Sequence, residues 1–209
     1  MRIIIIPISL VLLFIAGCVH EQMPAIYSID TTPVIPPLRE STVKEYHPPG
    51  AVWPQGWVPP QSVEKSWTAI VIHHSATPNG DEAVIDRWHK GNGWDGIGYD
   101  FVIGNGSDSA NGLTEVTFRW EQQRTGAHVG GTPGNWANKD AIGICLVGNF
   151  DKTIPTARQM ESLTKLVRFL QKRYGIPASR IYGHRNVPGA HETDCPGTKF
   201  PMAWFKSQL

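Results

Sequence analysis

The chain has 209 residues, of which 41% are hydrophobic and eight are tryptophan, so it can bury the core of one globular domain and carry additional segments. Its 19 basic and 18 acidic side chains leave a formal net charge of +1. Because nucleic-acid-binding domains carry a strongly basic surface, this balance excludes nucleic acid as the expected partner.

The N-terminal segment has the pattern of a targeting signal. One arginine precedes an apolar run from Ile3 to Ala16, which is shorter than the roughly 20 residues of a membrane-spanning helix. The following letters, IAGC, resemble the lipobox of bacterial lipoproteins, in which the signal is cut before a cysteine that carries lipid. We therefore expect a signal peptide over residues 1–17 and a lipidated Cys18, with an uncleaved anchor or an ordinary signal peptide as the alternative. Val19, in place of aspartate, favours the outer membrane, facing the periplasm, in a host with two membranes.

Residues 18–62 are predicted to form a tether. Eight prolines lie between residues 33 and 60, and no apolar period of a strand or helix runs through them. Proline removes backbone donors and favours extended chain, so this segment cannot easily build its own sheet or helix. Trp53 and Trp57 are expected to pack this arm against the domain that follows.

Residues 63–209 are predicted to form a single α/β domain with a central mixed sheet flanked by helices. Apolar, β-branched runs predict strands, and apolar residues at helical spacing predict helices. In chain order we expect a strand over 67–72, a helix over 81–93, a β-hairpin of strands over 98–104 and 113–118, a strand over 140–150, a helix over 155–175 and a short strand over 180–183. Thr156 and Gln159 form the pattern of a capping box at the start of the second helix.

The cysteines of this domain lie in different surroundings. Cys145 belongs to an apolar strand, whereas Cys195 lies in a polar loop rich in glycine and proline. A disulfide between them is one alternative outside the cytoplasm, and a small buried apolar role for Cys145 is the favoured one.

Two histidines and Cys195 suggest a metal site. His73 and His184 each lie at the end of a predicted strand, and Cys195 lies on the loop after the second strand. Catalytic zinc takes three ligands from His, Cys, Asp or Glu and leaves the fourth position for water. The spacing matches no short zinc-finger pattern, so surface or core histidines are the alternative on this basis alone.

Six sequence blocks between Trp67 and Trp204 resemble, in order, the zinc-dependent N-acetylmuramoyl-L-alanine amidases. This family includes phage amidases historically called lysozymes and the animal peptidoglycan recognition proteins. The blocks are AIVIHHSATP, IDRWHKGNGWDGIGYDFVIG, GAHVGG, DAIGICLVGNFD, TARQMESLTKLV and GHRNVPGAHETDCPG. The resemblance implies a peptidoglycan or muropeptide substrate, cut at the amide bond between N-acetylmuramic acid and the L-alanine of the stem peptide.

The resemblance also implies roles for individual residues. The Zn²⁺ ligands would be His73, His184 and Cys195, with Asp194 as the reserve ligand because a sister branch has aspartate in place of the cysteine. Tyr99 would point at the water bound to zinc. Thr193 stands where catalytic members have lysine or threonine, and it would donate a second hydrogen bond as charge develops on the substrate oxygen.

A groove for sugar and peptide is expected beside the zinc site, because aromatic faces suit sugar rings and apolar peptide edges. The residues expected to bind substrate are His74, Trp88, His89, Trp94, His128 and Asn135. A core position for Trp88 and a loop-anchoring role for Trp94 are the alternatives. His191 and Glu192 are candidates, by residue type only, for the group that protonates the leaving amine.

Two functions other than catalysis are alternatives to the amidase interpretation. Some members of the resembled family bind peptidoglycan without cutting it, and these characteristically lack the cysteine ligand, so Cys195 favours catalysis. A structural zinc domain fits poorly, because three ligands leave one coordination position open. The sequence therefore predicts a peptidoglycan amidase in the cell envelope that meets the membrane only through a lipid anchor, with a non-catalytic peptidoglycan-binding protein as the alternative.

Overall fold

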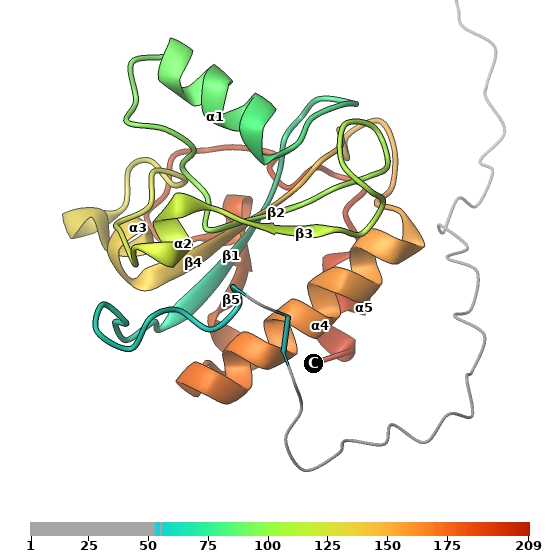
Figure 1. Cartoon of the computed structure of the whole chain (residues 1–209). Coiled ribbons are helices and arrows are strands. Elements are labelled where there is room, and N and C mark those ends of the chain that lie inside the picture. The colour runs from blue at the N-terminus through green and yellow to red at the C-terminus, as the bar shows by residue number, and fades with distance from the viewer. Residues whose placement is uncertain (1–52, 55) are drawn as a thin grey trace, which may run out of the picture. The chain divides into compact units, whose positions relative to one another are not determined.

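The computed structural model describes residues 53, 54 and 56–209 (Figure 1). The expected signal peptide, the lipidation site at Cys18 and most of the proline-rich tether lie outside the described residues. Within the described part of the chain, none of the helices has the length and apolar character needed to cross a membrane.

A five-stranded mixed sheet forms the centre of the domain, with the strand order β3-β2-β4-β1-β5 (Figure 1). Strands β1, β2, β4 and β5 run parallel, and β3 pairs antiparallel with β2. The bounds are β1 Ala69–His74, β2 Phe101–Ile103, β3 Thr114–Val116, β4 Ala141–Leu146 and β5 Ile181–Gly183. This arrangement confirms the predicted α/β class and the predicted hairpin.

Helices α1 and α4 lie on opposite sides of this sheet (Figure 1). The α-helices are α1 Glu82–Gly91, α2 Phe118–Glu121, α3 Trp136–Asp140, α4 Ala157–Tyr174 and α5 Met202–Ser207. Three short 3₁₀ turns accompany them, at Pro133–Asn135, Ala178–Arg180 and His184–Asn186. The predicted capping box of α4 is confirmed, because Thr156 Oγ1 accepts a hydrogen bond from Gln159 N and Gln159 Oε1 accepts one from Thr156 N.

The two faces of the sheet pack against different partners, because side chains alternate along a strand. Ile70 and Ile72 of β1 belong to the main core, together with apolar side chains of α4. His73 points to the opposite face and is only 1% exposed. The ring of His74 lies 5.8 Å from that of Phe150, which belongs to the main core. His73 and His74 therefore lie on opposite faces of the sheet, as the alternation of side chains along β1 requires.

The described end of the tether packs onto α4. The rings of Trp53 and Trp57 lie 4.8 and 5.5 Å from that of Phe169. Trp120 Nε1 donates hydrogen bonds to the carbonyl oxygens of Gly56 and Trp57, both at 3.1 Å. With Trp57 only 4% exposed, the expected packing of this arm is confirmed, and the packed part of the chain begins before residue 63.

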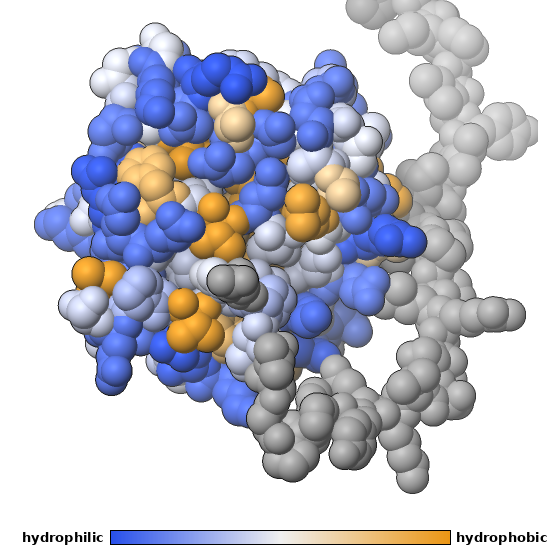
Figure 2. Space-filling model, in the orientation of Figure 1, coloured by the Kyte–Doolittle hydropathy of each residue, from blue (hydrophilic) through white to orange (hydrophobic). Residues whose placement is uncertain are grey.

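On the surface shown in Figure 2, hydrophobic residues form separate patches among hydrophilic ones. The large hydrophobic side chains with the greatest exposure are Val58, Val63, Trp88, Trp94, Leu113 and Ile154. Because isolated apolar residues are normal on a soluble protein surface, these patches alone mark no interface.

Candidate metal centre and its pocket

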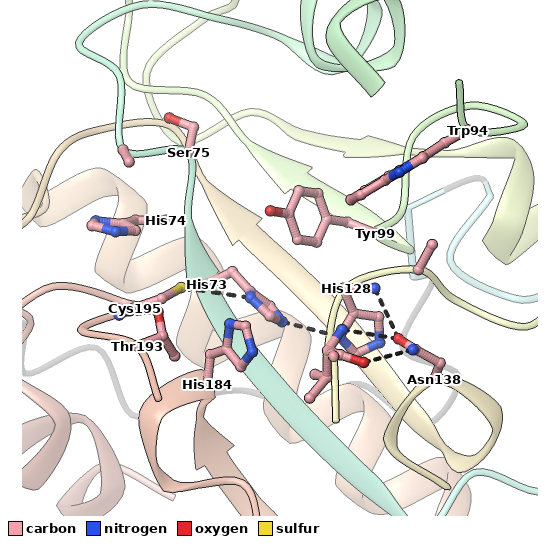
Figure 3. Close-up of a pocket in the computed structure, with 14 residues that line it drawn as sticks. His73, His74, Ser75, Trp94, Tyr99, His128, Asn138, His184, Thr193 and Cys195 are labelled. Carbon is pink, nitrogen blue, oxygen red and sulfur yellow. Dashed lines mark hydrogen bonds between the residues drawn. The ribbon is translucent and has the colours of Figure 1, made fainter. Parts of the chain in front are cut away.

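The parallel pairing of β1 with β5 brings the two predicted histidine ligands together. Ile72 pairs with Gly183 across these strands, so His73 and His184 follow at the same edge of the sheet. The loop after His184 returns to this edge and supplies Cys195. One potential ligand atom from each of these three side chains lies within 4.8 Å of the other two. The three residues predicted from the sequence therefore form one cluster (Figure 3).

The spacing of this cluster fits a zinc ion. Cys195 Sγ lies 3.6 Å from His73 Nδ1. With Zn–S about 2.3 Å and Zn–N about 2.0–2.1 Å, a sulfur and a nitrogen on one tetrahedral zinc lie about 3.5 Å apart. A set of two imidazoles and one thiol also suits zinc chemically, and three ligands leave one position for water.

The structure bears on two alternatives for Cys195, namely Asp194 as the ligand in its place and a disulfide with Cys145. Asp194 is exposed and lies outside the ligand cluster, and its carbonyl accepts a hydrogen bond from Gly197 N at 2.6 Å. Cys145 is fully buried in β4, and both cysteines are unpaired. The alternative of a Cys145–Cys195 disulfide is therefore wrong.

Burial keeps the imidazoles of the site neutral. It lowers the pKa of His73 well below its usual range, and the neighbouring His128 and His184 lower that pKa further. Burial likewise lowers the pKa of His184, and it lowers the pKa of His128 to about 3. A neutral imidazole has one nitrogen with a lone pair, which is the form that binds a metal.

The thiol of Cys195 is also held in its neutral form. Burial raises its pKa to about 12, although a hydrogen bond from the backbone N–H of His74 and the charge of Arg185 act in the opposite direction. A positive ion between this thiol and the imidazoles would counter the cost of desolvating the thiolate. The buried thiol is therefore compatible with a metal ligand.

Two hydroxyl groups face the same pocket. Tyr99 lies just before β2, and burial raises the pKa of its phenol well above the usual value, so the hydroxyl keeps its proton. Thr193 Oγ1 accepts a hydrogen bond from Cys195 N at 3.2 Å, which leaves its own hydrogen to donate. Both side chains line the pocket, and the catalytic roles that the resemblance implies for them stay predictions.

The pocket has a volume of about 600 Å³, which lies within the range of small-molecule sites. Eight residues predicted for the site line it: His73, His74, Trp94, Tyr99, His128, His184, Thr193 and Cys195 (Figure 3). Trp94 is 45% exposed and places an aromatic face at the pocket.

Three residues predicted to bind substrate lie outside the lining. Trp88 is 43% exposed, which contradicts the alternative of a core position for it. His89 Nδ1 accepts a hydrogen bond from Gly98 N at 2.9 Å, and its ring lies 4.6 Å from that of Trp94. Asn135 Oδ1 accepts a hydrogen bond from Asn138 at 2.7 Å. Contact of these three side chains with substrate stays a prediction.

The candidate proton donors also lie outside the pocket lining. His191 and Glu192 are both exposed, and the backbone N–H of His191 donates to the carbonyl of Gly130 at 3.0 Å. A Cβ atom at Gly131 would lie 2.3 Å from the His191 ring, so only glycine allows this approach. His191 thus joins the loop that carries Cys195 to the loop that carries His128.

Two residues that support the pocket were missed by the sequence analysis. Asn138, 7% exposed, accepts hydrogen bonds from the backbone N–H groups of His128 and Val129 at 2.8 and 3.0 Å. Arg119, 3% exposed, donates to the carbonyl of Ile97 and to the carboxylate of Asp95, and so braces the loop that carries Trp94. Both positions lack a sequence signal, because asparagine and arginine ordinarily belong to the surface.

Comparison with known proteins agrees with this geometry. The family model described as N-acetylmuramoyl-L-alanine amidase matches residues 63–198. The endolysin of Escherichia phage T7 is 32% identical over 153 residues, covering 69% of this chain and 90% of that protein. Peptidoglycan-recognition protein LB of Drosophila melanogaster is 29% identical over 139 residues, covering 61% of this chain and 53% of that protein.

Solved structures show the same similarity. N-acetylmuramoyl-L-alanine amidase LysC from Clostridium intestinale URNW superposes with a TM-score of 0.58 at 33% identity, covering 69% of this chain and 85% of that one. A mutant of Drosophila peptidoglycan recognition protein LB, in complex with tracheal cytotoxin, superposes with a TM-score of 0.52 at 26% identity, covering 72% and 89%.

Proposed function

Because the chain belongs to the N-acetylmuramoyl-L-alanine amidase family, we propose that it hydrolyses the amide bond between N-acetylmuramic acid and the L-alanine of the peptidoglycan stem peptide. We propose further that His73, His184 and Cys195 hold a zinc ion for this reaction. The observation that carries the proposal is the convergence of these three ligand atoms within 4.8 Å of one another beside a pocket of about 600 Å³.

The chemistry follows from the groups around the cluster. When bound, zinc supplies a Lewis acid for the scissile carbonyl and a water whose pKa is lowered to about 7. Tyr99 keeps its proton and donates a hydrogen bond to the oxygen on which negative charge develops. The hydroxyl of Thr193, beside the cysteine, is the second donor. Such donors act mainly on the transition state, where the charge is largest.

The substrate proposal rests on the relatives and on the shape of the site. The exposed ring of Trp94 offers an apolar face at the pocket, which suits a sugar ring or a peptide edge. A relative of known structure was solved with tracheal cytotoxin, a ligand reported for that protein. We propose that peptidoglycan or a muropeptide occupies the corresponding pocket here.

The location of the protein is a separate proposal. We propose that Cys18 carries lipid and holds the domain in the cell envelope, at the outer membrane and facing the periplasm if the host has two membranes. The support is the apolar run followed by IAGC in the sequence. Radiolabelled fatty acid should enter the wild-type protein in its host and should not enter Cys18→Ala.

A non-catalytic peptidoglycan-binding protein is the second candidate, because peptidoglycan-recognition proteins are among the relatives. The two candidates differ in one measurement. Purified protein loaded with zinc is incubated with muropeptides, and released stem peptide is detected through its new L-alanine amino group. Release that stops on removal of the metal supports the amidase. Binding of muropeptide without release would leave only the recognition function.

A further inference from the structure

The two ring nitrogens of His73 have different neighbours (Figure 3). Nδ1 lies 3.6 Å from Cys195 Sγ, on the side of the proposed metal. Nε2 lies 3.0 Å from Nδ1 of His128, within hydrogen-bond distance. A histidine binds a metal through only one nitrogen, and the hydrogen bond at the other nitrogen decides which one that is. His128 therefore contacts Nε2 of His73, the nitrogen whose hydrogen bond determines the tautomer of His73.

The direction of the hydrogen bond follows from a third partner. Nε2 of His128 lies 3.3 Å from the carbonyl oxygen of Ala141. A carbonyl can only accept, so this nitrogen of His128 carries the hydrogen. In the tautomer that has this hydrogen on Nε2, Nδ1 of His128 has the lone pair and accepts from His73. His73 must then donate from Nε2, which leaves the lone pair of His73 on Nδ1.

On the basis of the proposed zinc site, we propose that His128 is a positioning residue that holds His73 in the tautomer and orientation required for binding the metal through Nδ1. The chain of hydrogen bonds runs from His73 through His128 to the carbonyl of Ala141. This role differs from the substrate contact that the sequence suggested for His128. It is a role toward the metal ligand and not toward the reacting bond.

The fold holds the His128 ring firmly enough for this role. Asn138 accepts hydrogen bonds from the backbone N–H groups of His128 and Val129, and its own amide donates to the carbonyl of Val129 at 2.7 Å. A Cβ atom at Gly143 of β4 would lie 2.7 Å from the His128 ring, and one at Gly126 would lie 2.6 Å from it. The two glycines thus make room for the ring against the sheet.

His184 differs from His73 in this respect. Among the residues that the structure describes, none makes a hydrogen bond to its ring, and the side chain is partly exposed. Of the two proposed histidine ligands, only His73 is therefore oriented by a second described residue. Loss of such an outer partner typically weakens metal affinity by about 10–100-fold.

The zinc affinities of two isosteric variants test this proposal. His128→Asn keeps an oxygen that can accept from His73 Nε2, whereas His128→Leu has the same size and no acceptor. We expect the dissociation constant for zinc, measured by competition with a chromogenic chelator, to rise about 10–100-fold in His128→Leu and only a few-fold in His128→Asn. Equal affinity in His128→Leu and wild type would overturn the proposal. Equal losses in both variants would also overturn it, because packing would then be the cause.

The tautomers of the zinc-free wild-type protein provide a test that needs neither variant nor metal. Nuclear magnetic resonance of ¹⁵N-labelled imidazoles should show the hydrogen on Nε2 of both His73 and His128. A hydrogen on Nδ1 of His128 would reverse the hydrogen bond and refute the proposal. If the wild-type protein bound no zinc, the proposed metal function would fail, yet the tautomers would still decide the hydrogen-bond direction. Melting temperatures of the zinc-free variants show whether each one folds.

Discussion

The ring of Tyr99 lies 5.0 Å from the ring of His73, at an angle of 50° between their planes. The phenol and the proposed metal ligand therefore share one wall of the pocket. Tyr99→Phe removes the hydroxyl and keeps the ring, so zinc content and melting temperature should match those of the wild type. We expect kcat to fall by about 100-fold or more, because the lost hydrogen bond acts on the transition state. An unchanged kcat would remove Tyr99 from the mechanism.

The hydroxyl of Thr193 can accept one hydrogen bond and donate another. Its oxygen accepts from Cys195 N, and its hydrogen is available to the substrate. Thr193→Val loses both, and we expect kcat to fall by less than in Tyr99→Phe, because an uncharged hydroxyl on a loop is held less firmly. Thr193→Ser retains the hydroxyl and is the matched control. If the valine variant had full activity on muropeptides, no catalytic role would be left for this hydroxyl.

The proposed ligands should be individually required. His73→Ala, His184→Ala and Cys195→Ser each leave two of the three groups, so we expect zinc content and amidase activity to be lost together. Metal analysis of the purified proteins measures this loss. Asp194→Asn is the control, because Asp194 is exposed and outside the cluster. Loss of zinc in that variant alone would make Asp194 the ligand.

Asp100 should make the protein less stable as the pH rises. Its Oδ2 accepts a hydrogen bond from Gly143 N at 2.8 Å, and its Oδ1 has no partner among the described residues. Burial raises its pKa to about 7. The folded state therefore holds a proton that the unfolded chain releases near pH 4, so this group lowers stability progressively between about pH 4 and pH 7.

Asp100→Asn removes this titration. We expect the free energy of unfolding of the variant, relative to the wild type, to be higher at pH 8 than at pH 5 by roughly 2–3 kcal/mol at most. Urea unfolding of both proteins at the two pH values measures the difference, and the titrations that they share cancel. A difference that does not change with pH would mean that Asp100 ionises normally in the fold.

Trp57 should contribute to stability although it precedes the strands and helices. It is 4% exposed and packs on Phe169. Trp57→Ala leaves a cavity, and we expect it to lower the free energy of unfolding by about 3–5 kcal/mol. The neighbouring Val58 is 49% exposed, so Val58→Ala should change stability by no more than about 0.5 kcal/mol. Equal effects of the two substitutions in urea unfolding would contradict the packing of this arm.

Much of the fold could be predicted because local chemistry determines it. The run that ends in His73 and His74 is apolar and β-branched, so strand β1 and the opposite directions of the two histidines follow from the period of two. The capping box and the apolar stripe predict helix α4. Helices α2 and α3 have only four and five residues, and segments that short form through tertiary contacts and not through a sequence pattern.

The candidate site was predictable in part for a related reason. His73 and His184 end parallel strands, Cys195 follows on the loop after the second strand, and the resemblance strengthened this set. The contact between His73 and His128 was not predictable, because it joins residues 55 positions apart through a loop without regular structure. Its geometry depends on Asn138 and on the space above Gly143, which no local pattern reveals.

The side on which the arm enters the domain has a practical consequence. Trp53 and Trp57 pack on α4, whereas His73 points to the opposite face of the sheet. A fusion partner or a solid support joined upstream of Trp53 would therefore be attached behind the sheet and away from the pocket. Immobilised protein of this kind should therefore keep its pocket accessible to bulky substrates.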